Sequence, residues 1–110
     1  MLNKGKWKNQ QLIPEWYFNE AITPASHLLD VELNQQNNRY GYQWWYLKYK
    51  DCNITYARGI QGQYIFVIPE LNAVIVRLGH KRNDVRIDGH PEDVYRYIDT
   101  GIDIINKSQQ

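Results

Sequence analysis

The fold of this chain is decided by the stretch Gly59-Ile60-Gln61-Gly62-Gln63-Tyr64-Ile65-Phe66-Val67-Ile68-Pro69-Glu70-Leu71. A corner between Gly59 and Gly62 leads into an apolar strand over residues 63–68, and Pro69 stops that strand because proline has no N–H to donate. A second apolar run, residues 73–78, follows the turn, which predicts a β-hairpin. Because both runs are continuously apolar, we expect them in a central sheet buried on both faces.

The residues before this corner predict two further strands. Residues 40–49 alternate with the period of a strand and carry aromatic side chains on both faces. Trp44 and Trp45 fall on opposite faces, where we expect burial, although one ring could instead stack on a ligand. Residues 50–53 predict a turn and residues 54–58 a returning strand. Short turns join antiparallel strands, so the sequence predicts an antiparallel sheet of three to four strands.

One helix is predicted before the strands in the sequence and one after them. The expected fold class is therefore α+β, with both helices packed on the sheet. The N-terminal helix is expected to begin at Pro14 and to end before Pro24, with one apolar side. The C-terminal helix is expected from Pro91 to residue 105, after an acidic first turn. Its apolar stripe has helical spacing: Val94, Tyr97, Ile98, Ile102 and Ile105. Gly101 is expected to allow close contact between helix and sheet.

Residues 1–13 read as a helix end followed by a loop, residues 25–39 as a long loop and residues 80–89 as a polar loop. With 110 residues the chain has room for one domain, residues 1–110, with one modest core.

Charge and composition exclude several classes of function. A net charge of +1 gives no electrostatic basis for binding nucleic acid or an anionic membrane. Cys52 is the only cysteine, so an intrachain disulfide is impossible, and cysteine usage does not indicate whether the compartment is oxidising or reducing. The start of the chain is polar from the third residue, and we expect neither a signal peptide nor a membrane span there. If the chain is a fragment, that absence leaves the compartment of the parent protein unknown.

Metal-ligand spacing is missing from the sequence, and we expect neither a metal nor a cofactor. No histidine has a partner four residues away, and each is expected on the surface or in a loop: His27, His80 and His90. Acidic residues gather near the last helix, where a solvated first turn explains them: Asp84, Asp88, Glu92 and Asp93.

Four segments together resemble the C-terminal part of the serine β-lactamase-like hydrolases. This superfamily includes class C β-lactamases, penicillin-binding proteins, esterases and 6-aminohexanoate-dimer hydrolases. The resemblance covers nearly the whole chain: Asn3-Lys4-Gly5-Lys6-Trp7 with Leu12-Ile13-Pro14-Glu15-Trp16, then Tyr40-Gly41-Tyr42-Gln43-Trp44-Trp45, then residues 59–69, then residues 91–105. It implies a partial β-lactamase-like fold and, in the intact enzyme, amide or ester hydrolysis through an acyl-enzyme.

The resemblance also implies roles for the corner. In the family a Lys-Thr-Gly triplet or a variant lines the active site, and the N–H that follows forms half of the oxyanion hole. Ala57-Arg58-Gly59 fills the triplet here, and Ile60 supplies the N–H. Arg58, Gly59 and Gln61 are then the expected substrate-binding residues. Ala57 and Arg58 depart from the lysine and threonine of the β-lactamases, which argues against penicillin binding. A simple bulge or tight bend is the alternative interpretation of the two glycines.

The nucleophile is absent from the sequence. The family's serine lies in a Ser-x-x-Lys motif, and neither Ser26 nor Ser108 has a lysine three positions later. We therefore expect the chain to be inactive alone, with either the missing N-terminal part of the hydrolase or a second copy as its partner. The alternative is a non-catalytic α+β binding module derived from the same fold.

Overall fold

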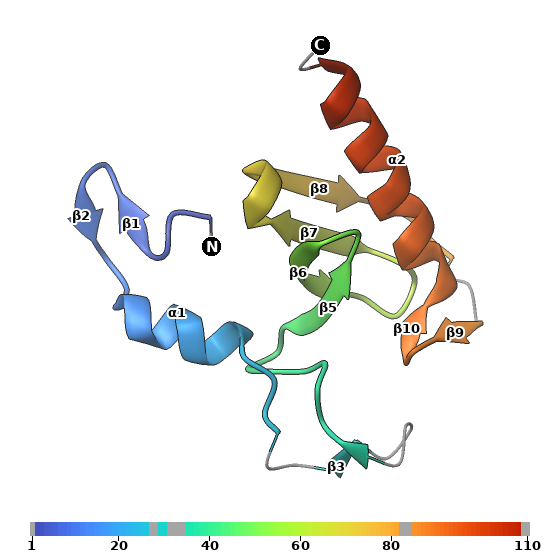
Figure 1. The fold of residues 1–110 in the computed structure, drawn as a ribbon, viewed down its shortest axis with the longest axis horizontal. Helices are drawn as coiled ribbons and strands as arrows, with labels where there is room; N and C mark the ends of the chain where they lie inside the picture. Colours follow the sequence, from blue (N-terminus) through green and yellow to red (C-terminus); the bar gives the residue numbers. More distant parts are fainter. Residues whose placement is uncertain (1, 27–28, 31–34, 82–84, 109–110) are drawn as a thin grey trace.

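Four antiparallel strands form the centre of the computed structural model, which describes residues 2–26, 29–30, 35–81 and 85–108 (Figure 1). The strands are β5 (Trp45–Tyr49), β6 (Cys52–Arg58), β7 (Tyr64–Ile68) and β8 (Ala73–Arg77). They lie side by side in the order of the sequence. This arrangement confirms the predicted α+β class and the antiparallel sheet.

The turn between β5 and β6 is shorter than predicted. Tyr49 pairs with Cys52, so only Lys50 and Asp51 form the loop. Both have positive φ angles, 50° and 63°, as the central residues of a type I′ hairpin require. Cys52 is therefore the first residue of β6 and is buried, and it does not belong to the turn.

The hairpin predicted after Pro69 is confirmed. A single 3₁₀ turn, η1 (Pro69–Leu71), follows β7, and Asn72 adopts a left-handed conformation with φ 48° before β8 begins. Asparagine tolerates this conformation because its short polar side chain can hydrogen-bond locally.

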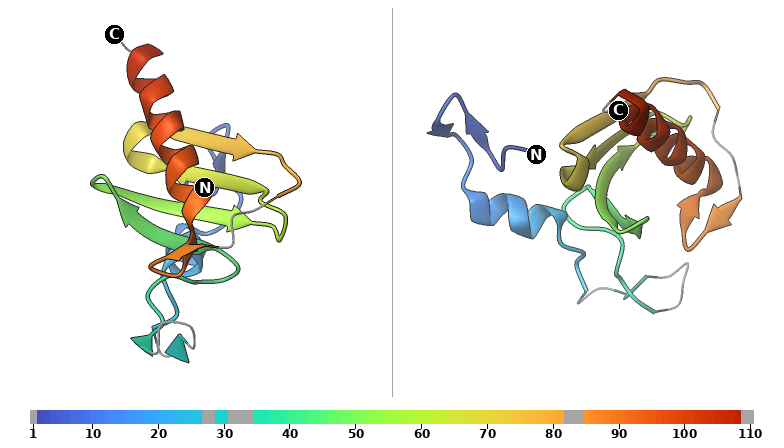
Figure 2. Two further views of the ribbon diagram at one scale, coloured as in Figure 1. Left: turned by 90° about the vertical axis from the view of Figure 1, so that its right-hand side faces the viewer. Right: turned by 45° about the horizontal axis from the view of Figure 1, so that its top comes forward.

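Helix α2 (Glu92–Ser108) packs across one face of the sheet and projects past the edge formed by β8 (Figure 2). Its buried residues Val94, Ile98 and Ile102 confirm the predicted stripe. They meet the inward-facing side chains of the strands to form the core: Leu47, Cys52, Ile54, Tyr56, Tyr64, Phe66 and Ile68. Gly101 lies against Ile75 of β8, as the close contact between helix and sheet requires.

The opposite face of the sheet corrects the prediction that both apolar strands are buried on both sides. Strand β8 is an edge strand, and Val74 and Val76 on this face are exposed. Ile65 on β7 is exposed as well, whereas Val67 is buried. A continuous apolar run therefore did not distinguish a strand covered on one face from one covered on both.

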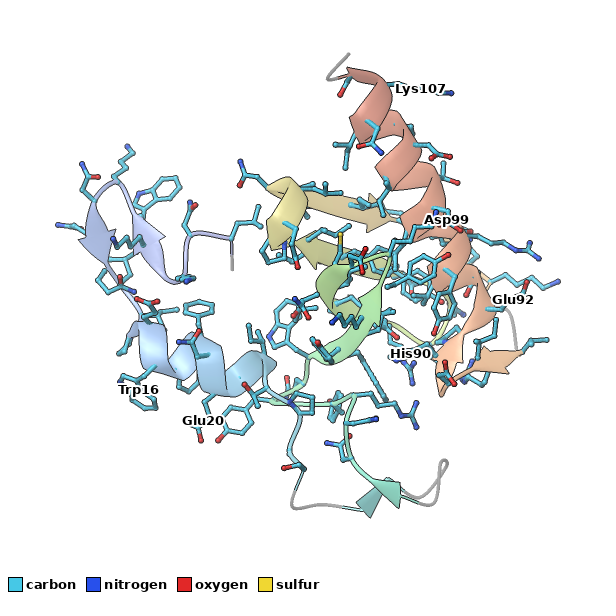
Figure 3. The ribbon with its side chains drawn as sticks, in the orientation of Figure 1. Trp16, Glu20, His90, Glu92, Asp99 and Lys107 are labelled. Carbon is cyan, nitrogen blue, oxygen red and sulfur yellow. The ribbon has the colours of Figure 1, made fainter. Side chains whose placement is uncertain are left out.

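The N-terminal segment contains a small hairpin where a helix end was expected. Strand β1 (Lys6–Trp7) pairs with β2 (Gln10–Gln11), and α1 (Glu15–Ile22) follows, with Pro14 as its N-cap and Thr23 as its C-cap. The position of this helix is as predicted. Its apolar side is not buried: Ala21 alone is, while Trp16 lies on the side of α1 away from the sheet (Figure 3).

Two further short pairs interrupt the predicted loops. Strand β3 (Leu29–Asp30) pairs with β4 (Gln35–Gln36), and β9 (Arg86–Ile87) pairs with β10 (His90–Pro91) just before α2. Helix α2 starts one residue after Pro91 and extends to Ser108, beyond the expected end. The predictions for His27 and Asp84 lie outside the described residues.

Candidate functional site

The corner between β6 and β7 is a tight loop closed by its own backbone. The ladder ends at the pair Arg58–Tyr64. Beyond it the Gly59 N–H donates to the Gln63 carbonyl at 2.8 Å, and the Gly62 N–H donates to the Gly59 carbonyl at 3.1 Å. Gly62 has φ 85°, which favours glycine. The tight bend therefore accounts for Gly62 without any catalytic role.

Two side chains hold this loop in place, one from β8 and one from the loop itself. Arg77 Nη1 donates to the carbonyls of Gly62 and Lys81, and Gln63 Nε2 donates to the Gly79 carbonyl at 2.8 Å. A Cβ added to Gly62 would collide with the Arg77 guanidinium and the Lys81 backbone. Because Gly62 is also buried, the loop is fixed on its inner side and open only on its outer side.

Ile60 and Gln61 form the open side of the corner. Ile60 is 82% exposed. Its N–H takes part in neither the ladder nor the loop bonds, and it donates in none of the hydrogen bonds found among the described residues. Gln61 is exposed beside it. An N–H that has no partner in a loop held in place is a candidate donor to an oxygen supplied from outside the chain.

Arg58, the last residue of β6, is held against two aromatic side chains. Its Cζ is 3.5 Å from the centroid of the Trp45 ring, and its Nη1 donates to the Tyr56 hydroxyl at 3.4 Å. The guanidinium thus stacks on Trp45, on the face that α2 covers. Arg58 also lines, with Gly59, a small cavity of about 230 Å³ at the corner. Trp45 is half-buried, and its ring carries this cation.

A buried polar cluster lies on the α2 side of β6, and it was not predicted from the sequence. Tyr56 Oη and His90 Nδ1 are 2.5 Å apart, and both residues are buried. Burial raises the pKa of Tyr56 to about 12, against the opposing effect of Arg58, so the hydroxyl stays protonated in its hydrogen bond with Nδ1. His90 is therefore a core residue at the end of the sheet, and the prediction of a surface or loop histidine was wrong (Figure 3).

Asp93 is the second correction in this region. It is buried in the first turn of α2 and accepts a hydrogen bond from the Tyr64 hydroxyl at 2.9 Å. Buried tyrosine hydroxyls need partners, and Tyr56 and Tyr64 both fall on the inward face of their strands. The need of these buried hydroxyls for hydrogen-bond partners could have predicted a buried polar residue in the first turn of α2.

A polar cavity of about 290 Å³ opens beside this cluster. Arg39, Asp88, His90 and Tyr95 are among its lining residues. Arg39 is buried and donates to the Gly89 carbonyl, and Tyr95 donates to the Ile87 carbonyl at 3.1 Å. Burial, reinforced by the negative charge of Asp88, raises the pKa of Tyr95.

Cys52 does not provide the missing nucleophile. Its side chain is buried in the core, and burial raises the pKa of the thiol, with Glu70 and Asp51 adding to the effect. A thiol needs a lowered pKa to react at neutral pH. Across the part of the chain that the structure describes, no three His, Cys, Asp or Glu side chains are grouped to hold a metal ion.

Comparisons with protein-family models, with curated proteins and with solved structures found no match to this chain. Helices long and apolar enough to cross a membrane are lacking in the described residues. The corner, the buried cluster and the polar cavity are therefore the structural features on which a proposed function rests.

Proposed function

We propose that this chain forms one wall of the active site of a serine hydrolase of the β-lactamase-like class, and that it is inactive alone. The observation that carries the proposal is the corner at Ile60, an exposed residue whose N–H donates in none of the hydrogen bonds found among the described residues, in a loop held by Arg77 and by its own backbone. The resemblance of the sequence to the C-terminal part of these hydrolases supplies the chemistry.

The reaction proposed for the complete enzyme is acyl transfer from an amide or ester. A serine from the nucleophile-bearing part attacks the carbonyl carbon, and the carbonyl oxygen takes up negative charge. The Ile60 N–H donates to that oxygen, and Gly59 contacts the substrate through its backbone, because the Gln63 side chain fills the side where a Cβ would lie. The leaving amine or alcohol departs with a proton, and water then hydrolyses the acyl-enzyme.

The remaining substrate contacts follow from where the side chains lie. Gln61 is exposed next to Ile60, so its amide can reach the leaving group. Arg58 is held on Trp45, so its proposed contribution is to support the strand end and to place positive charge behind the corner. The antiparallel sheet with a C-terminal helix across one face supports the proposal, because the resemblance implies that arrangement.

One observation favours the second candidate, a non-catalytic binding module. The polar cavity is lined by Arg39 and His90, among other residues, and binding a small polar ligand there requires no nucleophile. The two candidates make opposite predictions about the gene. A serine hydrolase wall requires a reading frame that continues upstream of Met1 into a Ser-x-x-Lys motif, whereas a module requires a start codon and ribosome-binding site at Met1.

The experiment has two readouts. We expect the purified 110 residues to show no hydrolysis of nitrophenyl acetate above background, and the upstream DNA to encode Ser-x-x-Lys in the same frame. Hydrolysis by the 110 residues that a serine-directed inhibitor abolishes would contradict the proposal, and so would an upstream stop codon with a separate ribosome-binding site.

A further inference from the structure

The polar cavity of about 290 Å³ lies at one edge of the central sheet. Strand β5 forms this edge, and Tyr46 and Lys48 of β5 line the cavity. Its other walls include Arg39, Asp88 in the turn between β9 and β10, and Tyr95 of α2. The cavity is therefore built by segments that only the fold brings together.

The backbone of β5 provides a hydrogen-bond donor at this edge. Tyr49 pairs with Cys52 across a two-residue turn, and such a closing pair is hydrogen-bonded. Lys48 and Tyr46 then belong to the alternate pairs of the ladder, whose N–H groups point away from the partner strand. The Tyr46 N–H accordingly donates to the Arg39 carbonyl at 2.7 Å. The Lys48 N–H donates in none of the hydrogen bonds found among the described residues, which leaves a donor at the edge of the cavity.

Arg39 places a fixed cation at the cavity. The residue is 5% exposed, its Nη1 donates to the Gly89 carbonyl, and its Cζ is 5.3 Å from the centroid of the Trp45 ring. A Cβ added to Gly89 would collide with the guanidinium, so the turn between β9 and β10 closes tightly against it. These contacts fix the plane of a group whose N–H donors match the two oxygens of a carboxylate.

The charged side chains at the cavity favour an anion with a single charge. Arg39 and Lys48 are cationic, and among the described residues that line the cavity Asp88 alone is acidic. Lys48 is exposed, and its ammonium forms no ion pair with any residue that the structure describes. Counted with His90 neutral, the lining has an excess of one positive charge, which attracts an anion and is balanced by one carboxylate.

The size of the cavity suits a small molecule. Its volume is close to the lower end of the range of ligand pockets, about 300–1,000 Å³. Leu47 and Tyr95 add apolar and aromatic lining beside the polar groups. We propose that the cavity binds a small carboxylate, whose carboxyl group pairs with Arg39 and accepts from the Lys48 N–H, and whose apolar part lies against Leu47 and Tyr95. Binding at this site does not require the hydrolase role proposed for Ile60.

Benzoate is the probe for this site, because it joins a carboxylate to an apolar ring, and benzamide is its neutral counterpart. Titration of the 110-residue chain is followed by the amide chemical shifts in NMR spectra. We expect saturable binding of benzoate, with a Kd on the order of 1 mM and the largest shift at the Lys48 amide. The Ile60 amide should not move, and benzamide should bind about tenfold more weakly or not at all.

Two substitutions measure the contribution of the charges. Lys48→Gln removes the exposed cation and should raise the Kd for benzoate about fivefold. Lys6→Gln, at an exposed lysine of β1 outside the cavity, is the matched control and should leave the Kd unchanged. Arg39→Lys keeps the charge but loses the planar fork, and it should raise the Kd about tenfold in a chain whose circular dichroism is unaltered.

The contrary results are equally definite. Equal binding of benzoate and benzamide, or equal Kd values for Lys48→Gln and Lys6→Gln, overturns the carboxylate site, and the two lysine variants decide alone if Arg39→Lys does not fold. Tighter binding of inorganic phosphate than of benzoate overturns it by naming another anion. Absence of saturable binding overturns the site and leaves the role of Ile60 standing. A shift confined to the Ile60 amide overturns the cavity site while supporting the oxyanion role of the corner.

Discussion

Tyr56 links the buried polar cluster to the strand that ends at the candidate corner. Its ring lies in the core, and its hydroxyl is shared between His90 Nδ1 and the Arg58 guanidinium. Since this contact depends on a protonated hydroxyl, the cluster makes the stability of the fold sensitive to alkaline pH.

We predict a loss of stability between pH 10 and pH 12 that Tyr56→Phe removes. The folded pKa of about 12 lies above the ordinary value of 10.0, so the unfolded chain loses this proton first. The contribution of protonated Tyr56 to the free energy of unfolding is complete below pH 10 and is lost as the pH rises toward 12. The full loss is about 3 kcal/mol. Urea unfolding at pH 9 and pH 12 measures it. A decline of equal size in Tyr56→Phe would contradict the assignment.

Asp51 gives a second prediction at the residue scale. It holds a positive φ in the two-residue turn, so Asp51→Gly should raise the free energy of unfolding by about 0.5–1 kcal/mol. Asp103→Gly, at an exposed site within α2, should lower it by about 0.5 kcal/mol instead. Thermal unfolding of the two variants checks the contrast, and a destabilised Asp51→Gly would show that the turn is not type I′.

Sequence reasoning identified individual residues best where the backbone alone decides. Pro14 and Asn72 lie where their conformational preferences place them, and Gly101 lies where the helix needs a residue without a side chain. It failed for His90 and Asp93, because burial of a polar side chain depends on which tyrosine hydroxyl lies opposite in the fold. Chain-local patterns do not contain that information.

At the scale of elements, the contact between α2 and β8 depends on Gly101. A Cβ there would collide with Ile75 Cδ1, so helix and edge strand approach as closely as they do only because the helix has no side chain at this point. Ile75→Val removes the atom with which the Cβ would collide.

We predict that the effect of Gly101→Ala changes sign with the residue at position 75. With Ile75 present, the substitution should destabilise the protein by about 1 kcal/mol despite the better helix propensity of alanine. In the Ile75→Val background it should be neutral or stabilising, which gives a coupling of about 1 kcal/mol or more in a double-mutant cycle. Additive effects would mean that the two residues are not in contact.

The strands of the sheet were predicted correctly, but the exposure of one of its faces was not. The apolar runs over residues 63–68 and 73–78 predicted the strands and the hairpin, and both are present. Val74 and Val76 nevertheless lie on an uncovered face. The sequence of a strand records that a face is apolar, and only the packing of other elements determines whether this chain itself covers it.

For the whole molecule, the exposed apolar side chains of Ile65, Val74 and Val76 and the edge strand β8 predict self-association of the purified chain. Light scattering should show a mass above that of the monomer that increases with concentration. The double substitution Ile65→Asp with Val76→Asp should reduce it, and Thr100→Asp should not. A strictly monomeric wild-type chain at high concentration would contradict this expectation.

The role of the Ile60 N–H is tested most directly by removing that one donor from the polypeptide encoded by the whole reading frame. Ile60→Pro eliminates the N–H, and Ile60→Ala keeps it while removing the same side chain. For hydrolysis of nitrophenyl acetate we predict that kcat falls about 10²–10³-fold in the proline variant relative to the alanine variant. Equal kcat values in two folded variants would contradict the proposal that this corner holds the oxyanion.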